Sequence, residues 1–150
     1  MSETRGDLII DDHGVLDRVR KLLLSLLAFG AFGTGLELLL IGHFEEITQI
    51  VPLVLLAAGL AAAAWHLASA RASVAALRWL MVLFILSGAV GIALHYRGNA
   101  EFELEMYPTM AGTELMGKTL TGATPVFAPG TMALLGGLGL VASYRVRIRS

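Results

Sequence analysis

The chain has 150 residues, of which 56% are hydrophobic and 15% are charged, and its mean hydropathy is +0.73. This composition is too apolar for a soluble globular domain, and the charges are separated by long uncharged segments, which indicates an integral membrane protein. The sequence has no cysteine and no basic patch, which excludes disulfides, thiol catalysis, thiolate metal sites and nucleic-acid partners.

Four apolar segments follow a polar, acidic N-terminal segment that we interpret as a cytoplasmic tail rather than a signal peptide. We expect each to form a transmembrane helix, over residues 22–42, 50–68, 79–96 and 126–144. The first covers about 31 Å at the helical rise per residue, which matches a hydrocarbon core of about 30 Å. Glycine and alanine recur in the first, third and fourth segments, so we expect close packing through small residues.

Basic residues collect in alternate segments between these spans. Cytoplasmic segments of membrane proteins are enriched in lysine and arginine, so we expect both termini to be cytoplasmic and residues 97–125 to lie outside. The expected cytoplasmic segments hold Arg5, Arg18, Arg20, Lys21, Arg71, Arg78, Arg145, Arg147 and Arg149, whereas the other loops hold only Arg97 and Lys118.

These observations predict an all-α integral membrane protein of the bacterial inner-membrane type. We expect one domain, residues 1–150, built as a bundle of four transmembrane helices with both termini inside. Residues 97–125, between the third and fourth spans, would form a structured cap on the extracytoplasmic face.

Glu37 is the one carboxylate inside an expected span, about 9 Å below the outer helix end by helical rise. An ionisable group within a span indicates a functional site, because its insertion costs about 2.5–3.5 kcal/mol. We expect Glu37 to face the bundle interior, either protonated or paired with His95 or Arg97. Three roles are compatible with this position: a structural glutamate that snorkels or hydrogen-bonds to a facing helix, a proton or cation site, and simple exposure to lipid headgroups.

Histidine and acidic residues gather at the outer ends of the first and third spans. Imidazole combined with carboxylate suits Zn, Mn or non-haem Fe, so a divalent metal is one hypothesis; hydrogen-bonded or solvated side chains without a metal are the alternative. Haem is disfavoured, because His66 and His95 lie at opposite membrane faces. The candidate residues for ion or partner binding are Glu37, His43, Glu45, Glu46, His95, Arg97, Glu101, Glu103 and Glu105, and the candidate metal ligands are His43, His95, Glu37 and Glu101.

The expected cap contains two amphipathic stretches. Residues 101–106 alternate acidic and apolar, so an extended segment would place three carboxylates on one face; a short helix capped by Asn99 is the alternative. In both, the apolar side would pack on the bundle and the acidic side would face water, a cation or a partner. Residues 109–120 predict a short interfacial helix that ends before Gly122.

No catalytic triad, phosphate loop, dinucleotide fingerprint or zinc-protease motif occurs in the sequence. We therefore expect a small non-enzymatic membrane protein, in contact with the lipid bilayer, that binds a cation or a partner subunit at its extracytoplasmic face. It would act as a homo-oligomer or as an accessory subunit of a larger complex. The alternatives are a proton- or cation-coupled transporter that uses Glu37, and a membrane-embedded enzyme acting on a lipid or quinone with Glu37 and His95 as acid and base.

Overall fold

The computed structural model describes residues 3–69 and 73–144, with side chains from residue 14 onward. Within these ranges the chain is helical and contains no strand, so the predicted all-helical class is confirmed. Of the basic residues used above to predict orientation, Arg71, Arg145, Arg147 and Arg149 lie outside the described residues, as does the side chain of Arg5. The helices are α1 (Glu3–Leu40), α2 (Ile47–Ala68), α3 (Val74–Met106), α4 (Gly112–Leu120) and α5 (Gly130–Ala142).

Three helices, α1, α2 and α3, are long and apolar enough to cross a membrane. The segment predicted as a fourth span contains a shorter helix, because residues 126–129 form turns and α5 has 13 residues. At 1.5 Å per residue α5 is about 20 Å long, less than a hydrocarbon core of about 30 Å. Pro125 and Pro129 explain the late start, since each proline disfavours the helical conformation of the residue before it.

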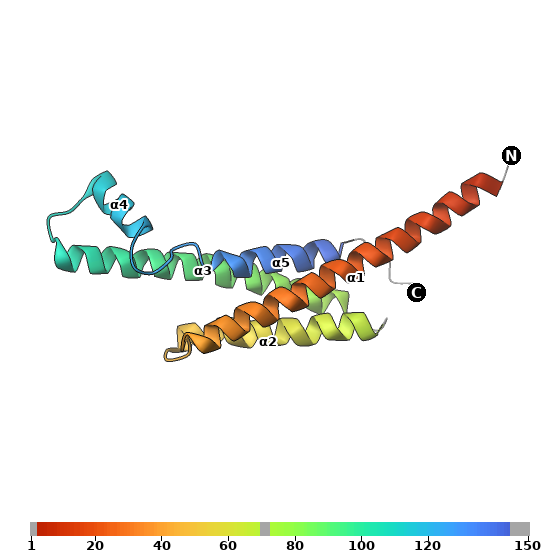
Figure 1. Cartoon of the computed structure of the whole chain (residues 1–150), viewed down its shortest axis with the longest axis horizontal. Coiled ribbons are helices and arrows are strands. Elements are labelled where there is room, and N and C mark those ends of the chain that lie inside the picture. The colour runs from red at the N-terminus through yellow and green to blue at the C-terminus, as the bar shows by residue number, and fades with distance from the viewer. Residues whose placement is uncertain (1–2, 70–72, 145–150) are drawn as a thin grey trace.

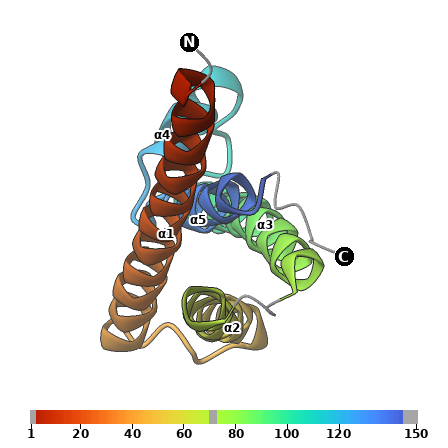
Figure 2. The ribbon, with the colours of Figure 1, turned by 90° about the vertical axis from the view of Figure 1, so that its right-hand side faces the viewer.

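Four of the helices pack in a ring, in which α1 contacts α2 and α5, and α3 contacts the same two helices from the other side. Figure 2 shows α5 between α1 and α3 on one side of this ring and α2 on the other. The turn between α1 and α2 lies at one end of the long axis with α4 beyond it, whereas the start of α3 and the end of α5 lie toward the other end (Figure 1).

The α3–α5 contact is close because glycines lie where the helices meet. A Cβ added to Gly88 would lie 2.8 Å from the Ala133 nitrogen, and one added to Gly136 would lie 2.6 Å from the Met81 carbonyl oxygen. Backbone atoms cannot move away from such a clash as a flexible side chain can. The small-residue packing predicted for these segments is therefore present, and here it brings backbone against backbone.

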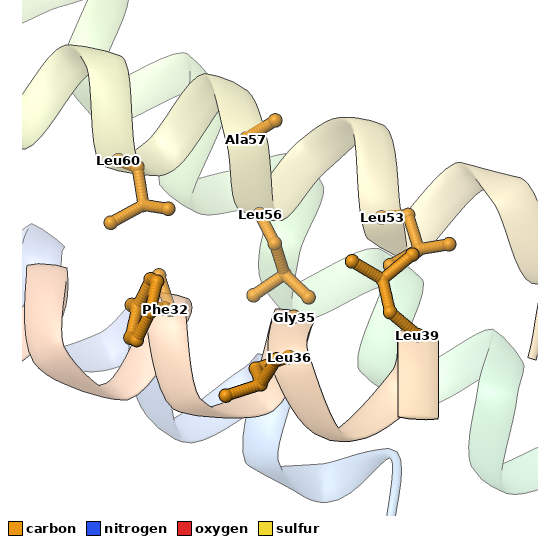
Figure 3. Close-up of a pocket in the computed structure, with 9 residues that line it drawn as sticks. Phe32, Gly35, Leu36, Leu39, Leu53, Leu56, Ala57 and Leu60 are labelled. Carbon is orange, nitrogen blue, oxygen red and sulfur yellow. The ribbon is translucent and has the colours of Figure 1, made fainter. Parts of the chain in front are cut away.

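The α1–α2 contact is looser and encloses an apolar groove of about 190 Å³. Leu56 extends from α2 toward Gly35 of α1 (Figure 3), where an added Cβ would lie 3.9 Å from it, an ordinary contact distance. Leucines and alanines of both helices, with Phe32, form the walls of this groove. Its chemistry is compatible with contact with lipid.

Helix α3 continues ten residues past the predicted end of the third span at residue 96. Its 33 residues correspond to about 50 Å, roughly 20 Å more than a hydrocarbon core. Both predicted forms of residues 101–106 are therefore wrong: the segment is neither extended nor a separate helix capped by Asn99, because it is the last part of α3. The short helix predicted over residues 109–120 is confirmed as α4, which folds back against α3 (Figure 1).

Candidate functional site at the end of helix α3

Residues 97–125, called the distal hairpin below, extend beyond the turn that joins α1 to α2 (Figure 1). The hairpin consists of the end of α3, the α4 helix and the segment that leads to α5. Because the hairpin lies past the ends of α1 and α2, its shape depends on contacts within itself.

Asn99 holds the hairpin together. This side chain is only 4% exposed, and its amide donates to the carbonyl oxygens of Thr119, at 2.9 Å, and Thr124, at 2.7 Å. Its own oxygen accepts from the Thr124 N–H at 3.2 Å. Gly122 permits this approach, since an added Cβ would lie 2.7 Å from the Asn99 side chain. One buried amide thus fixes the end of α4 and the return segment onto α3, because a buried polar group left unpaired would cost free energy.

Large apolar side chains remain exposed on this hairpin. It lies beyond the turn where α1 ends and α2 begins, so neither helix covers these side chains. Contiguous exposed apolar patches are typical of surfaces that contact other proteins or a membrane. Three acids on α3 and one on α4 share the hairpin with them. The exposed residues of this kind are Phe102, Leu104, Met106, Tyr107, Met116 and Leu120.

The acidic residues of the predicted cluster differ in their partners. Glu101 accepts from Arg97, one helical turn earlier, at 2.7 Å in an exposed ion pair. Glu105 is exposed and Glu103 is partly buried. Arg97 is thus paired within α3 and does not reach Glu37, which removes one of the two partners predicted for that carboxylate.

His43 and His95 come together from separate elements, as the predicted cluster requires. Their ring centroids lie 6.4 Å apart in an edge-on arrangement, with His43 in the α1–α2 turn and His95 on α3. The His95 Nδ1 lies 2.9 Å from the carbonyl oxygen of Pro125. Because a carbonyl oxygen only accepts, the imidazole donates from Nδ1, and its Nε2 is left to accept a proton or bind a metal.

Glu45 and Glu46 have a local structural role at the start of α2. The side-chain oxygen of Gln49 accepts from the Glu45 N–H at 2.9 Å and from the Glu46 N–H at 3.3 Å. Glu46 is the N-cap residue of α2, and its carboxylate accepts from the Thr48 hydroxyl at 3.4 Å. Acidic residues are favourable at this position because a helix N-terminus carries partial positive charge.

Glu37 does not face the interior of the ring. Its side chain is exposed on α1, and no hydrogen bond or ion pair connects it to any other side chain that the structure describes. The prediction that it faces the bundle is wrong. Glycines at positions 30 and 35 let α5 and α2 approach the other faces of α1, and Glu37 belongs to neither contact.

Sequence reasoning missed two polar contacts that fix α3. Arg78 donates to the carbonyl oxygen of Ser143 at 2.6 Å and to its hydroxyl at 3.4 Å, and so places a cation at the C-terminus of α5. Asn99 was interpreted as a helix cap and is instead the central residue of the hairpin. Two features of the sequence could have indicated this role: Asn99 is the only asparagine in the chain, and Gly122 follows it in the segment that leads to α5.

The described residues contain no group of three or more histidine, aspartate and glutamate side chains placed to bind one metal ion. The predicted metal set is therefore reduced to the His43–His95 pair. Comparisons of the chain with protein-family models, with curated proteins and with solved structures give no match.

Proposed function

We propose that this protein is a small non-enzymatic subunit of a membrane complex and that its distal hairpin binds a partner subunit. In this proposal α5, with the turns before it, completes a fourth passage through an inner membrane. Both termini lie in the cytoplasm and the hairpin lies outside, in agreement with the distribution of basic residues.

The buried Asn99 amide is the observation that carries the proposal. Its three hydrogen bonds fix a protrusion whose surface combines exposed aromatic and aliphatic side chains with acidic ones. A surface that is ordered before binding loses less conformational entropy on association, which favours affinity. Aromatic side chains and methionine are also enriched at protein interfaces.

The charge of the hairpin indicates the chemistry of its partner. Four acids and two basic residues lie in residues 97–125, and two more acids lie in the α1–α2 turn at the same end. We therefore propose a partner with a basic surface, bound through apolar contacts at Phe102 and Met106 and oriented by the acids around them.

Photo-crosslinking in native membranes tests the proposal. A photoreactive amino acid at Phe102 should give one adduct with a different chain, and Glu105→Lys should reduce its yield. Trp79, exposed near the start of α3 at the opposite end, is the matched control and should give no such adduct. A Phe102 variant that labels only lipid, or an adduct insensitive to Glu105→Lys, would contradict the proposal.

The His43–His95 pair favours a second candidate function, binding of a divalent metal. A metal-ligating histidine commonly donates its other ring nitrogen to a backbone carbonyl, as His95 does to Pro125. Two imidazoles would leave the remaining coordination positions to water. Calorimetric titration with Zn²⁺ should show one site that either His43→Ala or His95→Ala removes and His66→Ala retains; heat unaffected by the first two variants would exclude this function.

The transport and enzyme alternatives gain no support from the side chains that they need. Glu37 is exposed on the outer side of α1. The groove between α1 and α2 is lined by neither Glu37 nor His95.

A further inference from the structure

The return segment of the distal hairpin, residues 121–125, is held on α3 at two consecutive residues. The Asn99 amide donates to the Thr124 carbonyl oxygen at 2.7 Å, and the His95 Nδ1 donates to the Pro125 carbonyl oxygen at 2.9 Å. His95 and Asn99 are four residues apart on α3 and so lie on the same face, one helical turn from each other. Helix α3 therefore binds the return segment through a buried amide and, one turn nearer the ring of helices, through an imidazole.

His43 approaches this imidazole from the turn between α1 and α2. The backbone of the turn is fixed, because Gly42 has a φ of 70° and the His43 N–H donates to the Leu38 carbonyl oxygen at 2.8 Å. A helix commonly ends in this way at a glycine in the left-handed conformation. The His43 ring lies 6.4 Å from the His95 ring, centroid to centroid, and both residues are partly buried. Two hydrogen-bonded elements thus bring the two imidazoles together.

The spacing of the two rings fits one zinc ion after a small movement. Imidazoles bound to one Zn²⁺ at about 2.0–2.1 Å with tetrahedral angles have ring centroids about 5 Å apart. The centroids of His43 and His95 are 6.4 Å apart, so side-chain rotation has to bring them closer by about 1 Å. His95 would bind the metal through Nε2, because its Nδ1 donates to the Pro125 carbonyl oxygen.

The Pro125 carbonyl group connects the metal position to the hairpin. A bound metal withdraws electron density from an imidazole and so strengthens its N–H as a donor, and the acceptor in turn makes the ring a better ligand. Loss of such an acceptor typically weakens metal binding about 10- to 100-fold. Coupling between two equilibria is reciprocal, so bound metal favours the closed return segment over the open one by the same factor.

We infer that a divalent transition metal bound by His43 and His95 tightens the distal hairpin, with the hydrogen bond from His95 to Pro125 as the coupling. The metal joins the α1–α2 turn to α3 and holds the return segment closed. A more ordered hairpin loses less conformational entropy on association, so the metal also favours binding of the proposed partner. The inference rests on the metal-binding function proposed above, and the effect on the hairpin itself does not require a partner.

Hydrogen exchange of residues 121–128, measured on the full chain in detergent micelles, tests the coupling. The Thr124 N–H donates to the Asn99 side chain and the Ala128 N–H to the Pro125 carbonyl oxygen, both at 3.2 Å, so these two amides report opening of the return segment. Saturating Zn²⁺ should slow their exchange about 10- to 100-fold relative to the chelator-treated protein. Mg²⁺ is the matched control cation, because it prefers oxygen ligands and should not slow exchange.

Two variants separate the metal ligand from the hydrogen bond. His43→Ala removes a ligand but leaves the bond from His95 to Pro125, so exchange without metal should stay unchanged and the response to Zn²⁺ should be lost. His95→Ala removes both, so exchange should be faster without metal and should not respond to Zn²⁺. His66→Ala is the matched control variant, since this imidazole bonds to Ala62 within α2, and it should respond as the unaltered chain does.

Calorimetric titration of the same samples distinguishes failure of the inference from failure of the metal site. Zn²⁺ binding that His43→Ala removes, together with exchange that Zn²⁺ does not change, would leave the metal function standing and overturn the coupling. Absence of Zn²⁺ binding would overturn both. Slowing that Mg²⁺ also produces, or that persists in His43→Ala, would assign the cation to the acidic residues and likewise overturn the inference.

Discussion

In the α3–α5 pair, a Cβ added to Gly88 or Gly136 would lie within 3 Å of backbone atoms of the other helix, whereas in the α1–α2 pair a Cβ added to Gly35 would make ordinary contacts with Leu56. The polar side chains of α1 and α3 differ in the same way. Arg78 and Asn99 of α3 bind carbonyl groups elsewhere in the chain, while Glu37 of α1 is exposed without a partner in the described residues. Backbone-close packing and polar contacts with carbonyl groups thus hold α3 in place, whereas apolar side chains across a groove make the α1–α2 contact.

Substitution of two adjacent glycines of α5 should give the largest difference in stability. Gly136→Leu places a side chain against the Met81 carbonyl and should destabilise the α3–α5 pair by about 3 kcal/mol or more, because the backbone cannot yield. Gly137→Leu, with nothing within 4 Å, should change stability by less than about 0.5 kcal/mol. Tryptophan fluorescence during unfolding in denaturing detergent measures both, and similar midpoints would show that the helices do not meet at Gly136.

Asn99→Ala should open the distal hairpin while the helices of the ring remain packed. The change leaves two carbonyl groups and one N–H without their partner, at a local cost of about 2 kcal/mol, equivalent to about 30-fold faster amide exchange. Hydrogen exchange of residues 107–125 checks this. Asn99→Asp should also loosen the segment, since a carboxylate cannot donate to the carbonyl oxygens of Thr119 and Thr124. Protection that stays unchanged in both variants would rule out the proposed role of this amide.

Arg78→Ala should have a smaller effect, at the opposite end of the α3–α5 pair. It removes a charged donor from the Ser143 carbonyl and a cation from the C-terminus of α5, which together are worth about 1 kcal/mol. The same unfolding in denaturing detergent should show a modest loss of stability, and Arg78→Lys should partly restore it. A loss as large as that of Gly136→Leu would mean that the hydrogen bonds from Arg78 to Ser143, rather than glycine packing, hold the pair.

Arg97→Ala should have the smallest effect of the four. Its ion pair with Glu101 is exposed on both sides, and solvent and salt screen such pairs. We expect no measurable change in the unfolding midpoint. A clear loss of stability would indicate that the end of α3 depends on this pair as well as on Asn99.

The sequence was sufficient for features that depend on local pattern. Apolar length predicted α1, α2 and α3 as helices that can cross a membrane, and the spacing of residues 109–120 predicted α4. Apolar length also predicted a fourth span, where the structure has the 13-residue helix α5. Glycine frequency predicted close packing but not its location, because Gly136 and Gly137 are indistinguishable until the position of α3 is known.

The errors concern residues whose role depends on distant neighbours. The alternation of residues 101–106 suggested a break in structure, yet helical hydrogen bonds persist there because α4 packs against that part of α3. Asn99 was interpreted as a helix cap because its partners, Thr119 and Thr124, lie more than 19 residues later in the sequence, where no local pattern could indicate them. For Glu37 the apolar surroundings suggested burial in the bundle, but the direction of the side chain follows from which faces of α1 the other helices cover.

In the proposed topology the distal hairpin lies outside the membrane, at the end opposite the start of α3 and the end of α5. Single cysteines at Met106, Ser73 and Tyr144 test it directly in intact cells with a membrane-impermeant maleimide. The account predicts labelling of Met106→Cys in intact cells and labelling of Ser73→Cys and Tyr144→Cys only after the membrane is opened. Labelling of Tyr144→Cys from outside, or protection of Met106→Cys, would contradict it.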